Sequence, residues 1–177
     1  MKKLLFFLVS VPIICFSQGD FRKMNWGESE SVLKRLYPEI NFNKENNRAG
    51  LLDISHSGKL IGIDVRIVYS FYNDSLVFGA YTFKPMDFFA DLGERLNDFD
   101  KIQDRLYEKY PKNIYNWEET SYEDYKRFRR LDYKELEGTL IRHLITKGEY
   151  PTHYLWYSNY RFREIIEEFE KNELNDF

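Results

Sequence analysis

Two stretches of the chain have the pattern of an antiparallel hairpin, and they constrain the fold more than any other feature. In the first, apolar residues alternate with mostly polar ones from Ile63 to Phe71, as in a half-buried strand. Asn73-Asp74 tolerates left-handed backbone conformations and predicts a tight turn. The segment from Leu76 to Thr82 predicts the returning strand, and we expect Phe78 to share the face of Tyr69.

The second hairpin pattern lies near the end of the chain. From Leu140 to Ile145 the residues alternate in a period of two, as in a strand with two different faces. Lys147-Gly148-Glu149 then predicts a turn that reverses the chain direction. Tyr154 to Tyr157 predicts the returning strand. An antiparallel sheet is therefore expected to contain at least these two hairpins.

Helical patterns precede, separate and follow the hairpins. Ser29 can cap a helix that Pro38 ends, and residues 86–110 have apolar spacings of three and four, with a break near Asn97. Asn159 can cap a last helix. This order predicts an α+β fold with two αββ halves at 28–84 and 98–158, an antiparallel sheet with its helices on one face, and a closing helix at 159–173.

The first residues have the layout of a secretory signal peptide. Two lysines precede an apolar run from Leu4 to Phe16, which is shorter than the roughly 18 residues that a membrane span needs. We expect a signal peptide at 1–17, cleavage before Gln18 and one extracytoplasmic domain at 18–177, in the periplasm or secreted. A lipid anchor at Cys15 is the alternative, but Ile14 stands where a lipoprotein signal has a small residue.

Charge and cysteine content exclude several classes of function for the processed chain. Cleavage removes Cys15, the only cysteine, and with it disulfides, thiolate metal ligands and cysteine nucleophiles. Removing Lys2 and Lys3 from the 26 basic residues leaves 24 against 29 acidic residues, a net charge of −5. Nucleic acids and anionic lipids select for clustered positive charge, so neither is expected as the main partner.

The region from 21 to 32 resembles the start of a group of small exported bacterial proteins. The residues Phe21-Arg22 and Trp26-Gly27, with Ser29 and Val32, match the pattern FR…WG.S…V. Later landmarks are similar: Val68-Tyr69-Ser70-Phe71 with Leu76 and Tyr81-Thr82-Phe83, the helix end Leu106…Lys109-Tyr110-Pro111, which lacks the usual glycine, and Tyr157-Ser158. The resemblance implies a tandem αββ fold like that of β-lactamase inhibitor proteins and of small outer-membrane assembly lipoproteins, which bind proteins. It assigns no functional residue.

The segment 112–137 holds the candidate partner-binding residues. It is charged and aromatic without a sustained period. Trp, Tyr and Arg most often anchor protein interfaces, which selects Trp117, Tyr122, Arg127, Arg129 and Arg130. Two alternatives remain. Acidic residues flank the arginines, which could therefore form salt bridges on the surface, and the Trp117 ring could close the hydrophobic core.

Motifs that indicate catalysis are few. The sequence has no Gly-rich phosphate loop, nucleophile elbow or His-Glu-x-x-His. Ser31-Val32-Leu33-Lys34 matches an acyl-transfer pattern without its partner motifs. His143 and His153 fall on neighbouring strands and could approach each other, but a zinc site needs a third ligand. We therefore expect no metal and no cofactor.

These observations favour a non-catalytic exported binding protein that uses its sheet face to bind another envelope or secreted protein. The alternative is a carbohydrate-binding or carbohydrate-processing protein, in which the aromatic residues of segment 115–137 stack on a sugar.

Overall fold

The computed structural model describes residues 20–46, 50–83, 92–111, 116–121, 129–136, 139–145 and 152–162, with the backbone alone for the two strands between 116 and 136. The elements follow in this order: α1 (Glu30–Leu36), β1 (Asn43–Asn46), β2 (Leu52–Leu60), β3 (Ile63–Tyr72), β4 (Ser75–Phe83), α2 (Leu92–Lys109), β5 (Asn116–Ser121), β6 (Arg129–Leu136), β7 (Thr139–Ile145), β8 (His153–Asn159) and the 3₁₀ turn η1 (Tyr160–Phe162).

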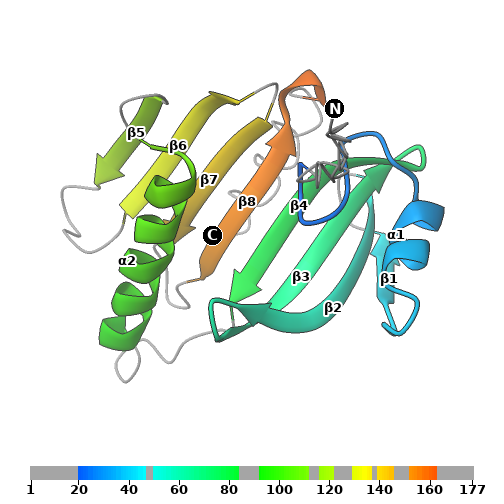
Figure 1. The fold of residues 1–177 in the computed structure, drawn as a ribbon, viewed down its shortest axis with the longest axis horizontal. Helices are drawn as coiled ribbons and strands as arrows, with labels where there is room; N and C mark the ends of the chain where they lie inside the picture. The colour runs from blue at the N-terminus through cyan, green and yellow to red at the C-terminus, as the bar shows by residue number, and fades with distance from the viewer. Residues whose placement is uncertain are drawn as a thin grey trace, which may run out of the picture.

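All eight strands form one sheet in the order β1-β2-β3-β4-β8-β7-β6-β5, and every neighbouring pair is antiparallel (Figure 1). The expected α+β class is confirmed. Each half of the described chain is one helix followed by four strands, and the halves meet where β4 pairs with β8. The two αββ halves predicted at 28–84 and 98–158 are therefore not confirmed.

Three strands that the sequence did not predict, β1, β5 and β6, show no clear alternation of apolar and polar residues. All four residues of β1 are exposed polar residues at the edge of the sheet, so no apolar face marks the strand. β5 and β6 lie in segment 112–137, where no period is sustained. A strand that pairs mainly through its backbone leaves little hydrophobic pattern in the sequence.

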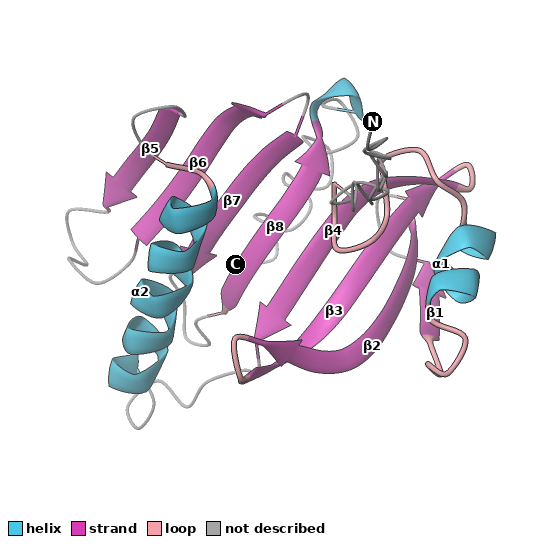
Figure 2. Cartoon of the chain, viewed as in Figure 1, coloured by secondary structure: helices cyan, strands magenta, loops and turns pink. Residues whose placement is uncertain are grey.

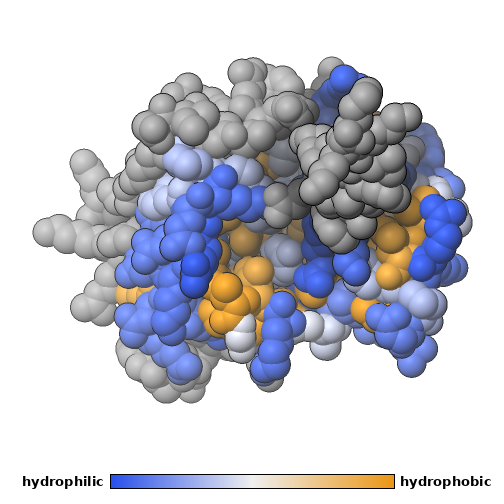
Figure 3. All heavy atoms as spheres, in the orientation of Figure 1, coloured by the Kyte–Doolittle hydropathy of each residue, from blue (hydrophilic) through white to orange (hydrophobic). Residues whose placement is uncertain are grey.

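Both described helices pack on the same face of the sheet, here called the inner face (Figure 2). Leu33 of α1 is fully buried in the main core, and Phe99, Ile102 and Leu106 of α2 are also buried. The expected placement of helices on one face is confirmed for these two. The predicted break at Asn97 is wrong, because α2 is one continuous helix. Its outer side carries hydrophilic residues (Figure 3).

A β-bulge in the first hairpin moves the later side chains of β4 to the opposite face of the sheet. The predicted turn forms, with φ of 48° at Asn73 and 58° at Asp74. Ser70 pairs with Phe78 while Phe71 pairs with Leu76, so Val77 is an extra residue in β4.

One extra residue turns every later side chain to the other face of a strand. Phe78 therefore packs with Leu51, Val77 and Ala80 on the face away from the helices, which we call the outer face. The expectation that Phe78 shares the face of Tyr69 is wrong for this reason.

The N-terminal segment 20–28 closes over the inner face. Phe21 and Met24 pair with each other around a tight turn at Arg22-Lys23. Phe21 is 1 % exposed, and its ring lies directly over Gly79 of β4. The Trp26 indole donates a hydrogen bond to Thr139 Oγ1 of β7 at 2.8 Å, which ties this segment to the second half.

β8 is followed by the 3₁₀ turn η1. Asn159 Oδ1 accepts a hydrogen bond from the backbone N–H of Arg161 at 3.0 Å, which is the contact of a capping residue. The rest of the predicted closing helix at 159–173 lies outside the described residues, as does the predicted signal peptide at 1–17, and both stay predictions.

Candidate functional site

The outer face of β7 and β8 carries a group of large, half-buried side chains. Along β7, Ile141, His143 and Ile145 are buried toward the helices, so the residues between them point to the opposite face. The same alternation in β8 places Tyr154 and Trp156 on the outer face. We call Arg142, Tyr154 and Trp156 the aromatic patch.

The sheet register brings the members of the aromatic patch together. Trp156 lies opposite Arg142 on β7 and opposite Ala80 on β4. The Arg142 guanidinium carbon is 6.0 Å from the centre of the Trp156 ring, and Tyr154 and Trp156 have ring centres 5.4 Å apart. These are the distances of a cation–π contact and of an aromatic pair.

The ring of Phe78 packs against one side of Trp156. Phe78 of β4 contacts it edge-on with ring centres 5.7 Å apart, and Phe78 itself is 7 % exposed. Trp156 itself is only partly buried, and a ring that is held in place loses little conformational freedom when a partner covers it. The patch therefore combines two aromatic rings and one guanidinium group on a pair of neighbouring strands, which are residue types that recur in protein interfaces.

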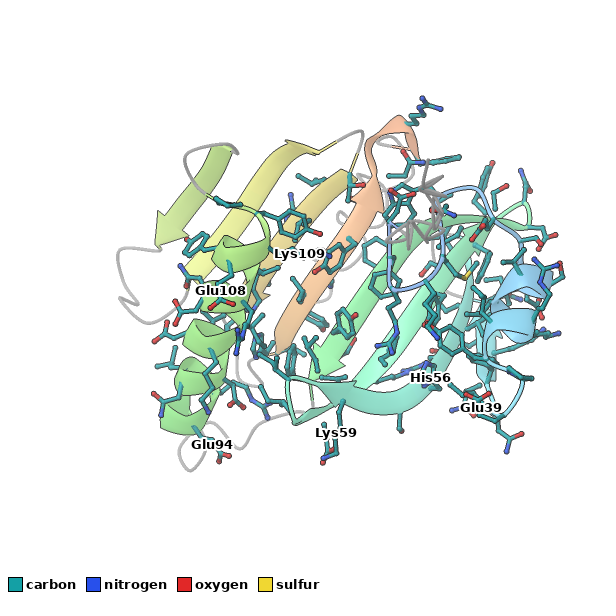
Figure 4. All side chains as sticks on the ribbon, in the orientation of Figure 1. Glu39, His56, Lys59, Glu94, Glu108 and Lys109 are labelled. Carbon is teal, nitrogen blue, oxygen red and sulfur yellow. The ribbon has the colours of Figure 1, made fainter. Side chains whose placement is uncertain are left out.

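The charged residues on the outer face of β2 and β3 are joined in ion pairs. Arg66 contacts Glu45 of β1 and donates to Ser55 Oγ at 3.0 Å. Lys59 and Asp64 form a pair at 3.0 Å in which both side chains are more than half exposed (Figure 4). Exposed pairs of this kind contribute little to stability or binding.

The structure places three of the residues that the sequence selected on the paired strands β5 and β6. Trp117 lies on the edge strand β5 opposite Tyr133, and Arg129 and Arg130 are consecutive on β6. Arg130 pairs with Leu144 of β7, so the backbone of β6 runs beside the patch. Tyr122 and Arg127 lie outside the described residues. Whether any of these residues binds a partner stays a prediction.

Sequence reasoning missed the aromatic patch although its signal was present. The second hairpin was recognised, and its period of two placed Arg142, Tyr154 and Trp156 on its strands. What the sequence did not give was the pairing of Trp156 with Arg142, because that register depends on the length and geometry of a turn.

The two histidines of the second hairpin meet on the inner face. His143 Nε2 and His153 Nε2 are 2.7 Å apart, and both side chains are 0 % exposed. His143 stacks on Phe99 and His153 stacks on Phe83, each at 3.8 Å between ring centres. This is the predicted approach of the two residues, at the distance of a hydrogen bond.

Burial keeps both imidazoles of this pair neutral. It holds the pKa of His143 well below its usual value, an effect that His153 adds to, and lowers the pKa of His153 to about 3, with a further contribution from the Arg95 charge. Among the described residues no group of three or more His, Cys, Asp or Glu is placed to hold a metal ion. The expectation that the protein carries no zinc stays a prediction.

The described helices include none with the length and apolar character that crossing a membrane requires. Comparisons with known proteins give no match: no protein-family model, curated protein or solved structure is similar to this chain.

Proposed function

We propose that the protein is a non-catalytic exported binding protein whose aromatic patch binds another protein of the cell envelope or of the secreted fraction. The observation that carries the proposal is the contact of Arg142, Tyr154 and Trp156 on the face of the sheet that lies opposite α1 and α2. Trp, Tyr and Arg anchor protein interfaces more often than other side chains, and they act best when neighbouring residues hold them in place.

Two features of the sequence support the same proposal. The lysines and apolar run at 1–17 favour export, and the resemblance of segment 21–32 to small exported bacterial proteins implies a protein-binding role. We also propose that the two halves are structural repeats and that a closing helix continues from the Asn159 cap. Each half supplies one helix and four strands, which supports a repeat.

A double variant tests the patch. Arg142→Ala with Tyr154→Ala removes two half-buried side chains and their contacts with Trp156 but leaves Trp156 on Phe78, so the protein should stay folded with a melting temperature lower by only a few degrees. We expect the partner, identified by crosslinking in cells that export the protein and then purified, to bind more than about tenfold more weakly, because two interface anchors commonly account for more than 1.4 kcal/mol.

Lys59→Ala is the matched control, because Lys59 is exposed on the same face and far from the patch in the sheet. It should leave the affinity unchanged. A double variant that binds the purified partner as well as the native protein would place the interface elsewhere.

The intact mass of the exported protein tests the predicted export and cleavage. We expect the mature chain to begin at or near Gln18 and to fractionate without the membrane, since the exit from the apolar run fits signal peptidase better than lipidation. A diacylated chain that begins at Cys15 would contradict this and place the protein on a membrane.

A further inference from the structure

The outer face of the sheet has a hydrophobic core of its own. It consists of Leu51, just before β2, and Val77, Phe78 and Ala80 of β4, which are between 0 and 7 % exposed. We call these four residues the outer core. Both described helices lie on the inner face (Figure 2), so neither of them covers it. An apolar sheet face is stable only when another element packs on it, and the outer core therefore requires a cover.

Burial on the outer face changes from one end of the strands to the other. Near the start of β4, Ser70, Phe78 and Ser158 lie side by side in the register and are 2, 7 and 4 % exposed. Further along β3 and β8, Arg66 is exposed and Tyr154 is only partly buried. The cover therefore lies at the end of the sheet where β4 begins and β8 ends.

The chain itself reaches this place after β8. The outer core is buried within a single chain, so a second copy is not needed to cover it. Phe162, the last residue of η1, packs against the outer core. The chain that follows Phe162 therefore starts on the outer face, at the end of the strands where the burial is greatest.

The other segments outside the described residues start elsewhere. Residues 84–91 and 146–151 are attached to the opposite ends of β4 and β8. The segments that flank β5 and β6 are attached at the far edge of the sheet. Residues 1–19 lead into the N-terminal segment on the inner face, and residues 47–49 are too few for a helical turn. Segment 163–177 is therefore the one that begins at the outer core.

The sequence of this segment has the apolar side that a cover needs. Ile165, Ile166 and Phe169 follow Phe162 at spacings of three, four and seven, which places the four on one side of a helix. The opposite side is charged. The chain continues to residue 177, which is enough for about four helical turns.

We propose that residues 163–173 form a helix that docks on the outer core, on the face of the sheet opposite α1 and α2. The inference rests on the closing helix proposed above and does not depend on binding of a partner. β4 and β8 then lie between two layers, and the helix holds the junction of the two halves. The aromatic patch stays accessible beside it, because Arg142 and Tyr154 lie where the outer face is only partly buried.

A double variant on the apolar side of the helix tests docking in the chain 18–177. Ile166→Ser with Phe169→Ser should lower the melting temperature by about 5 °C or more, because two buried apolar side chains are lost. Glu167→Ser with Lys171→Ser is the matched control on the opposite side, with the same net charge as the native chain. It should change the melting temperature by less than about 2 °C. Equal effects of the two double variants would overturn the proposal.

Photo-crosslinking identifies the face on which the helix docks. Benzoylphenylalanine in place of Phe169 should form crosslinks within one chain to the outer core, at Leu51 or Phe78. Crosslinks to Leu33 or Phe99 would place the helix on the inner face. Crosslinks between two chains would make the cover a second copy. Either result would overturn the proposal.

Double-mutant cycles give a second measure of the same contact. In a Phe78→Ala background the loss caused by Ile166→Ser with Phe169→Ser should fall to less than half, because contacting residues are coupled. In a Leu33→Ala background, with the change on the inner face, the full loss should remain. The reverse pattern would overturn the proposal. These measurements need no partner, so their outcome is independent of whether the aromatic patch binds one.

Discussion

Replacing Gly79 by alanine lowers the stability of the protein by about 3 kcal/mol, the upper end of the usual cost of overpacking. A Cβ at this position would lie 2.3 Å from Phe21 Cδ1 and 2.4 Å from Cγ, closer than real contacts allow. Phe21 has little room to retreat, because its ring centre is 5.3 Å from those of Tyr69 and Tyr81 and 5.4 Å from that of Tyr157. Denaturant unfolding measures the loss.

Gly58→Ala is the matched control for this prediction. Its added Cβ would meet Ile67 Cδ1 at 2.6 Å, but that atom is the far end of a flexible side chain and can rotate away. We expect a much smaller cost. In the Phe21→Ala background Gly79→Ala should also cost little, because the clash is gone; equal costs in both backgrounds would show that Phe21 does not occupy this place.

Acid destabilises the protein steeply below about pH 6.5, the ordinary pKa of histidine. The pKa values of His143 and His153 are lowered in the folded state, so the unfolded chain binds two more protons as the pH falls toward the folded values. Each histidine then costs about 1.4 kcal/mol per pH unit, and together they remove about 5 kcal/mol between pH 6.5 and 4.5. That is a large part of the stability of a typical domain.

The double variant His143→Leu with His153→Leu isolates this effect. Urea unfolding at a series of pH values should give a slope shallower by about two protons than that of the native protein over the same range. His56, whose pKa burial also lowers, is retained in both proteins and contributes equally. Identical slopes would mean that the pair is not neutral and buried in the folded state.

The sequence predicted the parts of the fold that local pattern determines. The turn at Asn73-Asp74, α1 before Pro38, and the pairing of β7 with β8 follow from residue preferences and periods of two or 3.6. β1 was not predicted because its residues are polar and exposed, so no apolar face distinguishes the strand. The bulge at Val77 was not predicted because it depends on how two strands pair, which the sequence of one strand does not show.

The candidate sites were harder to predict than the fold, because they depend even more on contacts between distant parts of the chain. Trp117 and the arginines stood out because they are near one another in the sequence, whereas Arg142 and Trp156 lie on two strands and meet only through the register of β7 and β8. Each of them looked ordinary by itself. In the recognised pattern at 21–32, Phe21 and Trp26 prove to be structural.

The junction of β4 and β8 has a consequence for the order of assembly. β4 is an inner strand only because β8, the last of the described strands, pairs with it, so the first half ends in an open, strongly apolar edge until β8 has been made. An open edge of this kind recruits strands from other chains. The protein therefore gains from remaining unfolded until its C-terminal strand is available, a condition that export of a complete, unfolded chain across a membrane would satisfy.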